Sequence, residues 1–352
     1  MLTVSGGKVV KARPFFSICV PSYNRAIHLS SLLDSIFRQN FDSYEVVICE
    51  DDSPERKSIK DIVCDYQSKY EDKIRYIENE ENLGYDANIR KLVSVSKGRY
   101  CFFMGNDDIM CDRALEVVHE LVRDNESIGL VLKSYAWFDE FPEKINQEVR
   151  YFKESRVLKR GLEAVSVCFR RSGVISGYIV KRDAAERIKT DEYDGSLYYQ
   201  MHMTAGVLAE EDAVTCSDIL VLCRNNVPPD FGNSKKEKGI YTPGAYTPEA
   251  RLRMISGALD IAAAAEKKVG EGLLELIRKD YANYFYPYIK DQFNLPLKDY
   301  IALYKAFGRQ GFKKYPMFHV YFVVGYLLGE EKFNWLTGIV RRVLGRSPRI
   351  GI

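Results

Sequence analysis

The segment FFSICVPSYNR, residues 15–25, decides the fold of this chain, because a short apolar run ends there in a turn of Pro, Ser and Asn. Such a run, bounded by turn residues, predicts a buried strand that stops at a loop. The segment EVVICEDDSPE, residues 45–55, repeats the pattern with acidic residues after the apolar run. We expect two more strands at residues 74–77 and 100–104, and the second of these ends in GNDD, residues 105–108.

Apolar residues recur at helical spacing between these strands, in residues 29–37, 59–66 and 89–95. Strands that alternate with helices in this way predict an α/β protein with a mostly parallel, doubly wound sheet. Open sheets of this kind bind ligands beyond the carboxyl ends of their strands. We therefore expect the polar loops that follow the strands to form the functional site.

The second half of the chain changes from mixed to helical character. Extended segments are expected at residues 128–138, 173–180 and 214–223, and a stretch rich in Pro and Gly, residues 226–248, is expected to be a linker or mobile loop. Apolar periodicity then predicts only helices, at residues 251–266, 272–284, 297–307 and 318–344.

Composition excludes several classes of function. The chain has 352 residues, of which 46% are hydrophobic, and its formal net charge is +2, so no strong field exists to hold a nucleic acid. No G-x-G-x-x-G or G-x-x-x-x-G-K-[ST] motif follows a strand, which disfavours a dinucleotide dehydrogenase and a P-loop enzyme. The eight cysteines form no C-x-x-C pair and the first residues lack an apolar signal core, so we expect a cytoplasmic protein.

Three segments together resemble glycosyltransferase family 2: SICVPSYNR, EVVICEDDSPE, and ENLGYDANIRKLVSVSKGRYCFFMGNDD of residues 81–108. Within that family they are most similar to the abequosyltransferase-like branch of bacterial surface-polysaccharide enzymes. The resemblance covers roughly residues 15–225. It implies a Rossmann-like GT-A fold, a nucleotide-diphosphate sugar donor with UDP as the default, a divalent metal (Mn²⁺ or Mg²⁺), and transfer with inversion at the anomeric carbon.

The resemblance, together with the composition and periodicity of the second half, predicts a division of the chain. Residues 1–225 would form the GT-A domain, with a nucleotide-sugar half at about 15–110 and an acceptor half at about 111–225. Residues 226–248 would follow as the linker, and residues 249–352 as a helical C-terminal region.

The loops after the strands supply the candidate donor-binding residues. A turn, a ring and a guanidinium could hold base and phosphate, and carboxylates or amides could accept hydrogen bonds from base or ribose. A plain turn and helix caps are the alternative for the same residues. Glu50 stands where the family has the first Asp of a pair, and its greater length changes the expected contact. The candidates are Pro21, Tyr23, Arg25, Glu50, Asp51, Asn82, Gly84, Asn88, Asn106 and Asp107.

Asp107 and Asp108 are the candidate metal ligands. Mg²⁺ and Mn²⁺ take one or two protein carboxylates together with phosphate oxygens of a substrate. In the family's D-x-D pattern the first Asp falls at Gly105, so only Asp107 matches directly. The alternative is an Asp pair that caps the helix expected near Arg113.

A general base must take the proton of the acceptor hydroxyl. The resemblance implies an acidic residue near the start of a helix in the second half of the domain. We expect Asp194 in this role, with Glu192 second, and His202 on the predicted helix 197–208 as a third candidate. Asp139 and Glu140 are further alternatives.

We therefore predict an inverting glycosyltransferase that acts on a glycan acceptor in capsule, O-antigen or similar synthesis. A GT-A-like subunit that binds nucleotide sugars without turnover is the alternative, which Gly105 keeps open. In the tail, Trp335 and other apolar residues lie among Arg341, Arg342 and Arg346. Such a segment either lies on the cytoplasmic face of the inner membrane, near a lipid-linked glycan, or packs on the catalytic domain. The sequence does not predict the oligomeric state.

Overall fold

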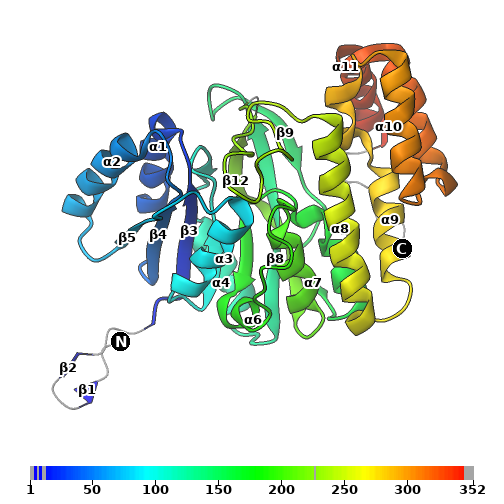
Figure 1. Ribbon diagram of the computed structural model, residues 1–352. Coiled ribbons are helices and arrows are strands. Elements are labelled where there is room, and N and C mark those ends of the chain that lie inside the picture. The colour runs from blue at the N-terminus through cyan, green and yellow to red at the C-terminus, as the bar shows by residue number, and fades with distance from the viewer. Residues whose placement is uncertain (1–3, 6–7, 10–12, 226, 345–352) are drawn as a thin grey trace.

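The computed structural model describes residues 4–5, 8–9, 13–225 and 227–344 of the chain. Its centre is a ten-stranded sheet whose main path runs β10-β12-β8-β11-β6-β3-β4-β5 (Figure 1). The strands on this path are β3 (Phe16–Ser22), β4 (Tyr44–Glu50), β5 (Ile74–Glu78), β6 (Tyr100–Phe103), β8 (Ile128–Phe138), β10 (Val157–Leu158), β11 (Tyr178–Lys181) and β12 (Asp212–Arg224).

The first half of the sheet is parallel, as the alternating pattern predicts. β3 pairs in parallel with β4 and β6, and β4 pairs in parallel with β5. The second half is mixed, because β11 runs antiparallel to both β6 and β8 while β12 is parallel to β8. The short β7 (Ile109–Met110) and β9 (Ile145–Val149) pair with β12 and β8, and β1 (Val4–Ser5) pairs with β2 (Lys8–Val9).

Helices cover both faces of the sheet, because alternate residues of each strand point to opposite sides. On β3, Ile18 and Val20 join one buried cluster, whereas Cys19 joins the other. The helices of the first 225 residues are α1 (Ala26–Phe37), α2 (Arg56–Lys69), α3 (Tyr85–Val95), α4 (Ala114–Val122), α5 (Leu162–Cys168), α6 (Arg182–Arg187) and α7 (Tyr199–Leu208).

The C-terminal region is helical and shares one core with the sheet domain. Its helices are α8 (Pro248–Val269), α9 (Leu273–Asn283), α10 (Leu297–Arg309) and α11 (Pro316–Leu344), and α11 contains a kink at Gly329. Arg170 and Arg171, on a 3-10 turn that follows α5, both form ion pairs with Asp280 of α9. Buried aromatic side chains such as Phe285 and Phe307 pack in the same cluster as the sheet residues.

One expected strand is much shorter than the sequence suggests. The observed strand is Tyr178–Lys181, so only residues 178–180 of the expected segment 173–180 lie in the sheet. Residues 173–177 turn instead, with Gly177 at a φ of 75°, a conformation that L side chains rarely adopt. The turn places Ser176 beside the loop that follows β6.

Candidate functional site

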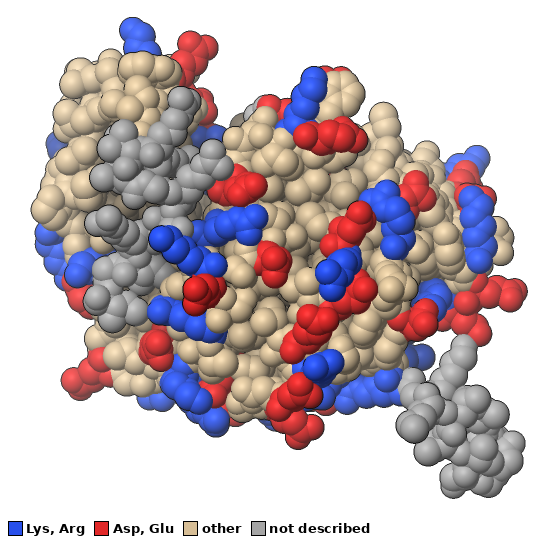
Figure 2. All heavy atoms as spheres, turned by 180° about the vertical axis from the view of Figure 1, so that it is seen from behind, with Lys and Arg blue, Asp and Glu red and all other residues tan. Residues whose placement is uncertain are grey.

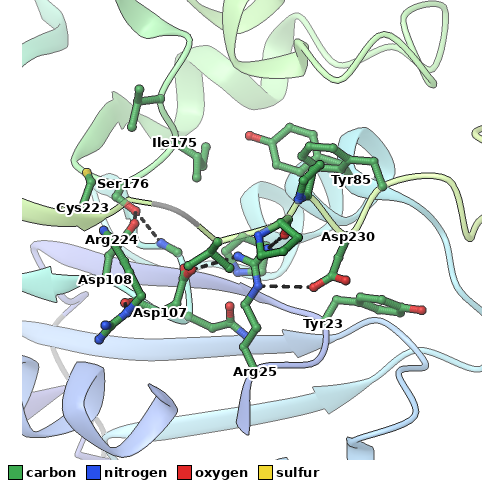
Figure 3. Close-up of a pocket in the computed structure, with 18 of the residues that line it drawn as sticks. Tyr23, Arg25, Tyr85, Asp107, Asp108, Ile175, Ser176, Cys223, Arg224 and Asp230 are labelled. Carbon is green, nitrogen blue, oxygen red and sulfur yellow. Dashed lines mark hydrogen bonds and ion pairs between the residues drawn. The ribbon is translucent and has the colours of Figure 1, made fainter. Parts of the chain in front are cut away.

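A cavity of about 830 Å³ lies at the carboxyl ends of β3, β4 and β6 (Figure 3). This is the edge of a parallel sheet at which open α/β folds bind their ligands. All but one of the sequence-based donor-binding candidates line it, together with both candidate metal ligands: Pro21, Tyr23, Arg25, Asp51, Asn82, Gly84, Asn88, Asn106, Asp107 and Asp108.

Asp51 ties two of these loops together. Its carboxylate accepts hydrogen bonds from the backbone N–H groups of Leu83 at 2.9 Å and Gly84 at 3.0 Å, and from the amide of Asn79 at 2.6 Å. Burial raises the pKa of Asp51 to about 6, although these hydrogen bonds oppose the shift. Asn88 donates to the backbone oxygen of Cys49, so it fixes the same corner.

Glu50 does not reach the cavity, and the structure corrects its assignment as a donor-binding residue. The side chain is fully buried and turns back on its own loop. It accepts hydrogen bonds from the backbone N–H groups of Asp52 at 3.2 Å and Ser53 at 2.7 Å, and it forms an ion pair with Arg56. Both carboxylate oxygens of Glu50 are thus engaged within its own loop.

Arg25 links two walls of the cavity (Figure 3). Its guanidinium is 2.9 Å from Asp107 and 3.3 Å from Asp230, and it also donates to the backbone oxygen of Pro228. Asn106 lines the cavity too, but its amide holds the backbone oxygen of Asn24 at 2.8 Å. The site therefore contains a cation that a diphosphate could engage, and Asn106 supports the loop that carries it.

Asp108 is held from two sides. Its carboxylate accepts a hydrogen bond from the hydroxyl of Ser176 and another from the backbone N–H of Arg224 at 2.6 Å. Burial and the neighbouring charge of Asp107 raise the pKa of Asp108 to about 7, against the effect of these two donors.

The carboxylates of Asp107 and Asp108 fit a divalent cation that also binds phosphate. One oxygen of each lies within about 3.2 Å of the point where a Cβ on Gly105 would stand, so the two approach a common position. Within the described residues, no group of three or more His, Cys, Asp or Glu side chains is arranged to hold a metal. Two carboxylates completed by substrate phosphates are a usual set for Mg²⁺.

None of the three candidate bases lines the cavity. Asp194 forms a two-point ion pair with Arg90, Glu192 is exposed, and the Nε2 of His202 contacts the backbone oxygen of Ile188 at 2.8 Å. Burial lowers the pKa of His202, which favours its neutral form. The ring of His202 lies beside Tyr193 and Tyr199.

Much of the cavity wall comes from residues that the sequence did not single out. Phe231, Glu237 and Tyr246, in the segment expected as a linker, line it, and Glu237 accepts hydrogen bonds from the backbone of Tyr85 and Gly232. The C-terminal region also contributes side chains to the cavity wall, among them Lys290. Further lining residues include Trp137, Ile175, Ser176, Asp230, Arg251, Asp291 and Glu330. The sequence signal that could have indicated this wall is the pair Pro228-Pro229 before Asp230, because prolines stiffen a loop.

The comparisons with known proteins agree with this geometry. The family model "Glycosyl transferase family 2" matches residues 17–180. The abequosyltransferase RfbV of Salmonella typhimurium is 27% identical over 221 residues, which are 60% of this chain and 66% of that protein. The chain thus spans slightly less than two thirds of this relative's length.

Two solved structures share the fold. A fragment of TarS from S. aureus, residues 1–349 in complex with UDP-GlcNAc, superimposes with a TM-score of 0.60 at 16% identity, covering 91% of each chain. The mannosyltransferase PcManGT of Pyrobaculum calidifontis, in complex with GDP-Man and Mn²⁺, gives a TM-score of 0.51 at 17% identity and covers 90% of this chain and 88% of its own. At these identities the likeness establishes the fold.

Proposed function

Because residues 17–180 belong to glycosyl transferase family 2, we propose that this chain transfers a sugar from a nucleotide-diphosphate sugar to a hydroxyl group of a glycan acceptor. The supporting observation is the cavity, where ten residues from three separate sequence motifs meet at the carboxyl edge of the sheet. The reaction inverts the anomeric carbon: the acceptor oxygen forms a bond to it, the bond to the diphosphate breaks, and the electron pair of that bond leaves with the diphosphate.

The donor class follows from the groups at the two ends of the cavity. Tyr23 and Tyr85 offer rings at one end, and Arg25 offers a positive charge where a diphosphate would lie (Figure 3). The neighbours TarS and PcManGT bind UDP-GlcNAc and GDP-Man, respectively. We take UDP as the first nucleotide to test and a hexose or deoxyhexose as the sugar. Capsule or O-antigen synthesis is the corresponding process, in line with the relative RfbV.

A divalent cation is part of this proposal. Asp107 and Asp108 would hold it, and when bound it neutralises charge that develops on the leaving diphosphate. Arg25 contributes in the same region, because its guanidinium already stands between Asp107 and Asp230.

Asp230 replaces Asp194 as our first candidate for the general base. It lines the cavity and shares Arg25 with Asp107, so its carboxylate lies near the phosphate-binding part of the site. Asp291 and Glu330 also line the cavity, but they pair with Arg251 and Lys290, respectively, and neither shares a cation with the candidate metal ligands as Asp230 does through Arg25. Asp230→Asn should lower turnover by at least about 100-fold with donor affinity nearly unchanged. A similar loss in Glu330→Gln instead would move the base to Glu330.

The function is tested by release of nucleoside diphosphate from a panel of UDP-, GDP-, CDP- and dTDP-sugars with Mn²⁺. Release that requires Mn²⁺ and fails in an Asp107→Ala variant purified in parallel supports the transferase. Binding of a nucleotide sugar without release, with every acceptor tested, supports the non-catalytic alternative, for which Gly105 in place of a carboxylate is the motivating observation.

Contact with an anionic membrane is the last part of the proposal. Residues 315–329 contain no Lys, Arg, Asp or Glu; Lys313 and Lys314 precede them, and Glu330, Glu331 and Lys332 follow them. Val323 and Leu327 of α11 are 57% and 76% exposed, and Trp335 is 69% exposed. Figure 2 shows few charged side chains on this end of the molecule, at the upper left. An apolar face beside basic residues is typical of helices that lie in a lipid interface.

Vesicles that contain phosphatidylglycerol test the membrane contact. Val323→Glu combined with Leu327→Glu should abolish co-sedimentation, whereas Leu276→Glu, at an exposed leucine on α9, should not. These exposed substitutions are preferable to truncation at Glu331, because truncation would remove the buried Phe333. Within the described ranges, the helices lack the combination of length and apolar character needed to cross a bilayer. The side chains of Arg341 and Arg342, and all of Arg346, lie outside the described residues.

A further inference from the structure

Ser176 connects the turn at residues 173–177 to both ends of the loop that carries the metal-ligand candidates. Its side chain is fully buried. The hydroxyl oxygen accepts a hydrogen bond from the backbone N–H of Gly105 at 2.7 Å, and the hydroxyl group donates to the carboxylate of Asp108. One side chain therefore fixes the first and the last residue of GNDD.

The turn that carries Ser176 is itself held in place. The ammonium group of the buried Lys133 donates to the backbone oxygen of Val174, and the backbone N–H of Gly177 donates to Phe103 at 2.9 Å. The backbone N–H of Arg224 holds the second oxygen of Asp108 at 2.6 Å. Ser176 is thus a fixed donor on a fixed turn, and Asp108 has little freedom to leave it.

The surroundings of Gly105 leave no space for a side chain at this position. A Cβ on Gly105 would lie 2.9 Å from Oδ2 of Asp108, 3.0 Å from Oγ of Ser176 and 3.2 Å from Oδ1 of Asp107. Contacts of this length leave no room for a side chain without movement of its neighbours. The space that a carboxylate at position 105 would need is occupied by Asp108 and Ser176.

We propose that Ser176 is a positioning residue, which holds Asp108 beside Asp107 so that Asp108 supplies the carboxylate that position 105 lacks. The inference rests on the proposed function, because it assigns Ser176 a role toward the divalent cation of that site. Partners that orient a metal ligand commonly change metal affinity 10- to 100-fold when removed. The hydroxyl also lets Asp108 remain buried and oriented before a cation binds.

The test measures the affinity for UDP by calorimetry with and without Mn²⁺, or for GDP, CDP or dTDP if one of these binds the wild type more tightly. The increase in nucleotide affinity that Mn²⁺ causes should be about 10- to 100-fold smaller in Ser176→Ala than in the wild type. The affinity without metal should be unchanged. Gly105→Ala should do the same by displacing Asp108 and Ser176. Ser35→Ala is the matched control: Ser35 is buried, accepts from the N–H of Met110 and donates to Leu32, and is not among the cavity-lining residues.

Three results would overturn the inference: an unchanged Mn²⁺ effect in Ser176→Ala, an equal loss of affinity with and without Mn²⁺, or a Gly105→Asp variant that binds Mn²⁺ and nucleotide more tightly than the wild type. If Ser176→Ala does not fold, Gly105→Ala decides, since it displaces Asp108 and Ser176 without deleting any hydrogen-bonding group. A wild-type chain that binds none of the four nucleotides with Mn²⁺ would refute the proposed function as well, which separates the two failures.

Discussion

Asp194 is expected to stabilise the fold through its ion pair with Arg90. A substitution of Asp194 distinguishes this structural role from the role of general base that the sequence suggested. The Arg90 guanidinium contacts both carboxylate oxygens, with Nη2 donating to Oδ2 at 2.9 Å, and the side chains of Arg90 and Asp194 are only 17% and 8% exposed. Arg90 also donates to the backbone oxygen of Thr190 and lies over the ring of Tyr199. The pair therefore joins α3 to the loop before α7.

Asp194→Asn keeps the shape of the side chain and removes its charge. Loss of one partner from a buried pair costs about 3–5 kcal/mol, and the partial exposure of Arg90 places this pair near about 3 kcal/mol. For a chain of this size, with an unfolding entropy of about 0.7 kcal/mol/K, that loss lowers Tm by roughly 4 °C. Urea unfolding gives the free energy directly, and kcat for nucleoside diphosphate release should stay within about twofold of the wild type because Asp194 does not line the cavity.

A double-mutant cycle with Arg90→Met separates the pair from the rest of the site. The double variant should be less destabilised than the sum of the single variants, because neither charge is then left unpaired. Asp194→Asn with an unchanged urea midpoint, unchanged donor affinity and a turnover lower by orders of magnitude would refute this reasoning and restore Asp194 as the base.

Four further outcomes are expected. Asp107→Ala should abolish transfer and cost less than the about 3 kcal/mol of the Arg90–Asp194 pair, because Arg25 keeps its contacts with Asp230 and Pro228 and the charge beside Asp108 is removed; full activity would remove Asp107 from the site. Glu50→Gln should destabilise the chain by about 3 kcal/mol in urea with donor affinity intact, because the buried carboxylate serves two N–H groups and Arg56; weaker donor binding alone would contradict the correction made above. Gly84→Ala should weaken UDP binding in calorimetry, because φ is 85° and the new Cβ would collide with the Ser234 side chain. Burial raises the pKa of Asp51 to about 6 and those of Asp86 and Asp108 to about 7, so the free energy of unfolding without metal should increase as the pH falls from about 8 to about 6.5; a urea midpoint that falls over this interval would contradict these shifts.

The direction of that pH dependence follows from the protonation of the folded chain. A carboxyl group whose pKa is raised by folding binds its proton more tightly in the folded state, so its contribution is complete below the unfolded pKa and is lost as the pH rises through the folded pKa. His28, His119 and His202 act in the opposite sense below about pH 6.5, because burial lowers the pKa of each and their contribution is lost as they gain a proton.

The sequence by itself determined the sheet and the part of the site that follows its strands. Runs such as EVVIC and the helical spacing around α1 encode burial locally, so β3, β4 and β6 were predicted within one or two residues. Because parallel strands end at one edge, the loops after them had to meet, and Asp51, Asn82 and Asp107 do line one cavity. Local periodicity and chain direction are sufficient for this inference.

Tertiary structure alone decided what each polar side chain contacts. Glu50 turns to Arg56, and Asp194 meets Arg90 from 104 positions away, so a carboxylate that looks free in the sequence is already paired. Ser176 reaches Asp108 only because the strand begins at Tyr178 and not at residue 173, so that the turn ending at Gly177 folds over the loop after β6. Such pairings depend on distances between segments far apart in the chain, which no local pattern records, whereas burial and strand direction are written in neighbouring residues.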